Sequence, residues 1–99
     1  MNTIASIKEQ LKTSEKPVAK AFHIGEHFKV LLFGFNKGVN LEDHKAYHPT
    51  KLLVLEGEVI YHQGKKDYKL SAHDEIDIPP KATHSVFALQ DSLILLTQG

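Results

Sequence analysis

The chain has 99 residues, enough for one domain with one hydrophobic core. Its 12 basic residues are all lysine and balance 12 acidic residues, so no arginine is present to pair bidentately with phosphate or guanine, and a nucleic-acid partner is not expected. No apolar run approaches the roughly 20 residues of a membrane span. The absence of cysteine excludes a disulfide framework and a thiolate site, and with a start unlike a secretory signal it predicts a cytoplasmic protein.

The first predicted element is a short amphipathic helix. Apolar residues recur at helical spacing, at Ile4, Ile7 and Leu11, with polar residues between them. Thr3 is the expected N-cap. Pro17 cannot continue a helix, so the helix should end before it.

From residue 18 onward, short apolar runs alternate with residues that form turns. The runs cover residues 28–35, 51–62, 68–70, 76–78, 85–89 and 93–97. Many strands joined by close turns are typical of a β-sandwich or β-barrel. We therefore expect a single all-β domain over residues 1–99, with the helix and a linker at 1–16 and a barrel at 18–99.

Two of the predicted strands are apolar on both faces, at residues 30–33 and 93–96. A strand with apolar side chains on both faces is usually covered on both sides of its sheet. One expected cover is the N-terminal helix, and the other is a second copy of the chain.

Two stretches carry a familiar pattern of spacings. The first contains Gly38, His44 and Gly57, and the second contains Ile-Pro-Pro followed by His-Ser-Val, with Pro79 and His84 at its key positions. These stretches resemble the paired motifs of the cupin superfamily, and with their flanking strands they cover residues 28–97. The resemblance implies a stand-alone barrel of the cupin jelly-roll type and a homodimer.

The cupin motifs hold a metal at four positions, and the resemblance assigns two of them here, His44 and His84. Ala46 stands at the position of the second histidine, and Thr50 stands at the position of the glutamate. Two of the four metal-ligand positions that the family pattern implies are therefore retained.

The second motif also lacks two of the family's glycines, which are His73 and Lys81 here. Histidine adopts positive φ more often than most residues, so the turn at His73 remains compatible with the fold. Three further histidines, His23, His27 and His62, lie in or beside expected turns and are interpreted as surface residues.

His48 is a candidate third metal ligand. It would lie on the same strand face as His44 but roughly 13 Å along an ideal strand, so it reaches the site only if the chain turns before Pro49. A site of His44, His48 and His84 would suit Zn, Fe, Ni, Cu or Mn. The alternative is that His44 and His84 hydrogen-bond to each other or to water in the barrel mouth.

Tyr47 and Thr50 are candidate ligand-binding residues, since a phenol ring supplies contact area and a hydroxyl supplies orientation. Two functions remain open. In the first, the barrel mouth binds a small molecule, with or without a divalent transition metal. In the second, the protein is a metal-dependent dioxygenase or isomerase of the cupin type. The metal content of the purified protein would separate them.

Overall fold

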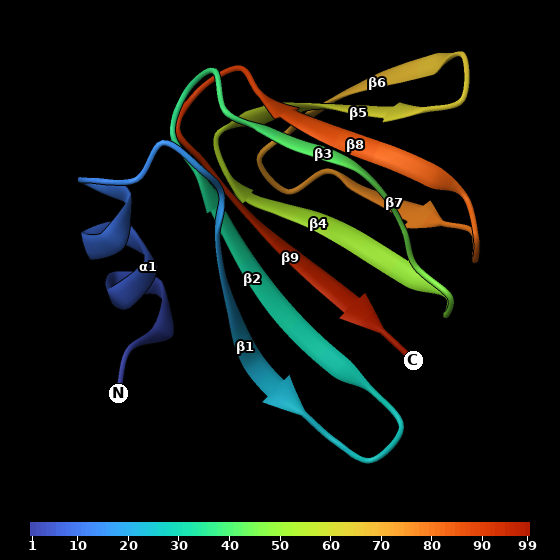
Figure 1. Ribbon diagram of the computed structural model, residues 1–99, viewed down its shortest axis with the longest axis horizontal. Coiled ribbons are helices and arrows are strands. Elements are labelled where there is room, and N and C mark those ends of the chain that lie inside the picture. Colours follow the sequence, from blue (N-terminus) through green and yellow to red (C-terminus); the bar gives the residue numbers. More distant parts are fainter.

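The computed structural model describes the backbone of residues 1–99 and every side chain except those of Asp43 and His44. Within this description one helix precedes nine strands (Figure 1). The elements are α1 Thr3–Leu11, β1 Val18–Ile24, β2 Lys29–Phe35, β3 Asn40–Lys45, β4 Thr50–Glu56, β5 Glu58–Gln63, β6 Lys66–Ser71, β7 Glu75–Ile78, β8 Thr83–Ala88 and β9 Ser92–Gln98. No helix in the described chain is long and apolar enough to cross a membrane.

The strands form two antiparallel sheets that pack against each other (Figure 1). The strand order is β1-β2-β9-β4-β7 in the first sheet and β3-β8-β5-β6 in the second. The chain crosses between the sheets several times, for example from β2 to β3, which is the topology of a jelly roll. The prediction of an all-β jelly-roll barrel with a short N-terminal helix is confirmed.

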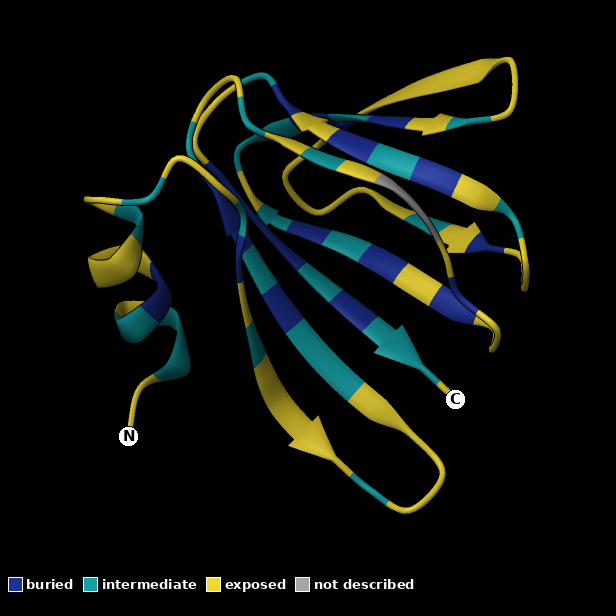
Figure 2. Ribbon diagram, viewed as in Figure 1, coloured by how far each residue is buried: buried dark blue, intermediate teal, exposed yellow. Residues whose placement is uncertain are grey.

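Alternating side chains fill the space between the sheets. Leu52 and Val54 point inward from β4, and Val59 and Tyr61 point inward from β5; all four are fully buried. This alternation follows from the two-residue period of a strand and appears as buried bands in Figure 2. These inward-facing residues of both sheets form the hydrophobic core between them.

The helix α1 packs on the outer face of the first sheet. Ile7 is 0% exposed and forms a second apolar cluster with Val18, Leu32 and Leu93. Gly34 permits this approach, because a Cβ atom there would collide with the Ile7 side chain. The prediction that the helix covers one of the doubly apolar strands is confirmed.

The expected helix cap is wrong by one residue. The side chain of Asn2 accepts a hydrogen bond from the Ala5 backbone N–H at 2.9 Å, whereas Thr3 is the first helical residue. Asparagine is among the preferred N-cap residues, so the observed cap needs no special explanation.

Two strands, β1 and β3, were not among the predicted apolar runs. Each is an edge strand of its sheet. An edge strand has one neighbour and needs fewer buried residues, and β1 is exposed over most of its length. The predicted run at 51–62 is in fact two strands, β4 and β5, which separate at Gly57.

The chain turns sharply at Gly57 and passes from one sheet to the other. Its φ is +87°, a left-handed value that favours glycine. A Cβ atom at this position would also collide with the Asp91 carbonyl and the Ser92 side chain. The expected corner at Gly57 is confirmed.

The second motif keeps its backbone shape without its glycines. His73 has a φ of 77° and Lys81 a φ of 68°, both in the left-handed region. The prediction that His73 tolerates its turn is therefore confirmed.

Replacing Gly57 with alanine should destabilise the fold by more than about 2 kcal/mol, because the new side chain meets both backbone strain and a collision. Gly64→Ala is the matched control, since Gly64 has a φ of +62° but open space around it. That control should cost about 1 kcal/mol. Urea unfolding followed by circular dichroism measures both, and equal losses would contradict the packing at Gly57.

Ile7→Ala should lower the free energy of unfolding by about 3 kcal/mol, because it leaves a cavity where the Ile7 side chain packs between α1 and the first sheet. The exposed residue Gln10 on the same helix supplies the control, and Gln10→Ala should change stability by less than about 0.5 kcal/mol. An Ile7→Ala variant as stable as the parent would show that α1 does not pack as described.

Candidate functional site

His84 lies on β8 in the interior of the barrel and is 2% exposed. Its Nδ1 is 3.0 Å from the carbonyl oxygen of Ala82. Because a carbonyl oxygen only accepts, Nδ1 must carry the hydrogen and donate it. In the neutral ring the lone pair is then on Nε2, which is the arrangement that a metal ligand or a hydrogen-bond acceptor requires.

The ring of Tyr61 lies beside His84, and it connects His84 to a second aromatic ring and to an amide. The ring of Tyr61 has its centroid 5.7 Å from that of His84, and the ring of Tyr68 lies 6.2 Å from that of Tyr61. The Tyr61 hydroxyl donates to Oε1 of Gln63 at 2.6 Å. Gln63 is the direct cross-strand partner of His84 in the pairing of β5 with β8. The interior site is thus apolar with a few placed polar groups.

Burial raises the pKa of the Tyr61 hydroxyl from 10.0 to about 12, and the nearby Tyr68 adds to this rise. At neutral pH the hydroxyl therefore keeps its proton. This protonated state is the one that the hydrogen bond to Gln63 needs.

The predicted partner of His84 is His44, whose side chain lies outside the described residues. The backbone register nevertheless pairs His44 with His84 across β3 and β8. The same register shifts between Leu41 and His44, which marks a β-bulge beside the pair. The two residues assigned by the cupin motifs are therefore neighbours in the sheet, and metal binding by them stays a prediction.

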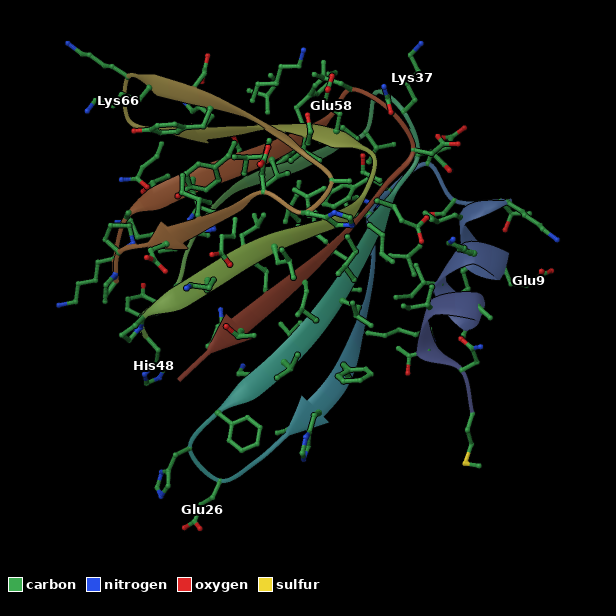
Figure 3. The ribbon with its side chains drawn as sticks, turned by 180° about the vertical axis from the view of Figure 1, so that it is seen from behind. Glu9, Glu26, Lys37, His48, Glu58 and Lys66 are labelled. Atoms are coloured by element: carbon green, nitrogen blue, oxygen red, sulfur yellow. The ribbon has the colours of Figure 1, made fainter. Side chains whose placement is uncertain are left out.

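His48 and Tyr47 lie on the surface. His48 lines a hollow of about 430 Å³ together with the turn between β1 and β2, and Figure 3 shows its side chain beyond the start of β4. Tyr47 is 69% exposed. The chain does turn before Pro49, but this turn leads His48 outward, whereas His84 is buried.

Thr50 lies at the inward-facing start of β4 and is buried. Its hydroxyl donates to the His48 carbonyl at 3.0 Å, so this group serves the local turn. Thr50 also lines a hollow of about 570 Å³ at the ends of β2, β4, β7 and β9, a volume suited to a small ligand.

The described side chains do not form a metal site by themselves. Among them, no group of three histidine, cysteine, aspartate or glutamate residues could hold a metal ion. Ala46, at the position of the family's second histidine, is buried and offers no donor. A metal in this barrel would therefore depend on His44 in addition to His84.

Sequence reasoning did not consider Gln63 as a polar residue of the barrel interior. The available signal was the alternation along residues 58–63, which places Val59, Tyr61 and Gln63 on one face. This face lies beside His84 because of the register between β5 and β8, and a single sequence does not reveal that register.

No protein-family model and no curated protein matches the chain. Solved structures of cupins do match it. An RmlC-like cupin from Desulfovibrio desulfuricans is 27% identical, with 83% of this chain and 80% of that chain covered and a TM-score of 0.77. A cupin superfamily protein from Desulfitobacterium hafniense is 18% identical, with 83% and 75% covered and a TM-score of 0.79.

A variant of salicylate 1,2-dioxygenase from Pseudoaminobacter salicylatoxidans is also similar, with a TM-score of 0.88 at 14% identity. The alignment covers 97% of this chain but 33% of that chain. Together these similarities show that the chain has the fold of a small cupin domain, which the two motifs predicted.

The stability of the protein should fall as pH rises above 10, toward pH 12. An unfolded tyrosine ionises near pH 10 while folded Tyr61 holds its proton to about pH 12, so in this window the unfolded state binds fewer protons and gains stability. Urea unfolding at pH 9 to 12 should show a steeper decline for the parent than for Tyr61→Phe. Parallel declines would contradict the burial of the Tyr61 hydroxyl.

Proposed function

We propose that the protein binds a small molecule inside the barrel and that His84 is the polar anchor of the site. The buried His84, whose tautomer is determined by the Ala82 carbonyl, carries this proposal. Small-molecule sites are mostly apolar with a few polar groups that orient the ligand, and Val86 and Tyr61 supply such apolar walls here. Tyr47, at 69% exposed, takes no part in this interior site.

His44 is the proposed second anchor. The β3–β8 register that pairs it with His84 supports this role. A divalent transition metal held by the two imidazoles is the alternative form of the site, and Zn, Fe, Ni, Cu and Mn are its candidates. Two protein ligands hold a metal weakly compared with the three or four of established sites, so binding of an organic ligand without metal is the preferred form.

A metal-dependent dioxygenase or isomerase is the second candidate function. The superposition on salicylate 1,2-dioxygenase over nearly the whole of this chain favours it. At 14% identity that likeness supports the fold alone. The replacement of two cupin metal positions by Ala46 and Thr50 argues for binding rather than catalysis.

A homodimer and a cytoplasmic location also remain proposals. The half-buried residues Val30 and Leu53 on the outer face of the first sheet lie outside the apolar cluster that α1 forms, and they support a second copy as partner. The cysteine-free composition supports the location.

The test is a thermal-shift screen of small metabolites and of Zn, Fe, Ni, Cu and Mn, with metal per chain measured by plasma mass spectrometry. Compounds that raise the Tm of the parent should lose most of that effect in His84→Gln and His84→Ala. The exposed His62 gives the control, and His62→Ala should respond like the parent.

Equal Tm shifts in the parent and in both His84 variants would contradict the proposed site. One metal per chain in the parent, lost in His84→Gln, would instead make the metal form correct.

A further inference from the structure

A row of polar residues crosses the interior face of the second sheet near its open end. His84 on β8 pairs with Gln63 on β5, and Gln63 pairs with Lys66 on β6. Directly opposite residues of antiparallel strands project from the same face of the sheet. The three side chains therefore begin on one line that runs from the barrel interior to the tip of the β5–β6 hairpin, where Figure 3 labels Lys66.

This face carries a positive charge and no negative one among the described residues of β5, β6 and β8. The inward registers are residues 59, 61 and 63 of β5, 66, 68 and 70 of β6, and 84, 86 and 88 of β8. They include Lys66 but neither aspartate nor glutamate. Asp67 belongs to the opposite face, where it pairs with His62. An anion entering along this face would meet a favourable field.

The amide of Gln63 has a defined orientation. Its Oε1 accepts the hydrogen of the Tyr61 hydroxyl at 2.6 Å, so its Nε2 and the two hydrogens on that atom point the other way. Gln63 is only partly buried, so its side chain is in part open to solvent. The Nε2–H groups of Gln63 are thus oriented to donate a hydrogen bond to an oxygen atom of a ligand.

Tyr68 supplies an apolar surface beside this donor. It is 40% exposed, and its ring lies 6.2 Å from that of the buried Tyr61. A flat or aliphatic group resting on this ring would lose contact with water while its polar end reached Gln63.

We propose that the barrel binds a small organic carboxylate. One carboxylate oxygen accepts from Nε2 of Gln63, Lys66 supplies the opposite charge, and the apolar part of the ligand packs on Tyr68. Tyr61 is a positioning residue that keeps the amide of Gln63 in its donating orientation. This inference rests on the proposed function and names the chemical class of the ligand. The carboxylate binds at the rim beside Gln63 and Lys66, and the Nε2 lone pair of His84, which only accepts, is left for a donor group elsewhere on a natural ligand.

The experiment is a titration of the ¹⁵N-labelled full chain with benzoate and with benzamide, which has a similar shape but no charge. The parent should bind benzoate at least about tenfold more tightly than benzamide, with shifts of the Gln63 side-chain amide signals. Lys66→Gln should remove most of this preference. The neighbouring turn residue gives the control, and Lys65→Gln should keep it.

Two further variants test the donor. Gln63→Leu should weaken benzoate binding by about tenfold, because a charge-assisted hydrogen bond is lost. Tyr61→Phe should weaken it a few-fold and alter the Gln63 amide signals of the free protein, a change that lost packing at a distance would not produce.

The proposal is overturned by equal affinity for the two probes, by equal losses in Lys65→Gln and Lys66→Gln, or by the absence of any shift at Gln63. A neutral ligand whose Tm shift depends on His84 would then leave the proposed function intact and reject only the carboxylate.

Discussion

The burial of His84 is the constraint on which the interior site depends. The alternation of side chains along β8 puts this imidazole in the same inward column as Val86 and Ala88, so it is removed from water. A buried polar ring needs hydrogen-bond partners, and the Ala82 carbonyl provides one at Nδ1. The tautomer follows from this contact, and with it the chemistry that Nε2 offers to a ligand.

The interior has a different character from that of a four-ligand metal centre. Ala46 and Thr50 stand at two of the metal positions of the cupin motifs, and the Thr50 hydroxyl is engaged with the His48 carbonyl. The polar groups near His84 come instead from the neighbouring strand β5, where the Tyr61 hydroxyl orients the amide of Gln63. Donors and a lysine at the rim suit an anionic organic ligand better than a cation.

Periodicity predicted the elements with strong apolar patterns and missed those without. The helix at Thr3–Leu11 follows from its 3.6-residue repeat, and the covered strands β2 and β9 follow from their two apolar faces. The edge strand β1 is exposed over most of its length and produces no such pattern. The corner at Gly57 and the left-handed turn at His73 were predictable because positive φ restricts which residues fit.

Site residues were predictable only where a motif marked them. The spacing of the cupin motifs marked His84, whereas ideal strand geometry could not show that the turn before Pro49 carries His48 outward. Gln63 reaches the site because β5 pairs with β8, which places it opposite His84, a residue distant in the sequence; periodicity within one strand does not encode this pairing.

The central claim is that the Nδ1–H of His84 is donated to Ala82 and leaves the lone pair on Nε2. Long-range ¹H–¹⁵N correlation of the imidazole nitrogens at neutral pH tests it most directly. In the neutral ring, Nδ1 should carry the hydrogen and Nε2 should show the shift of an unprotonated nitrogen. A neutral ring protonated at Nε2 would contradict the claim.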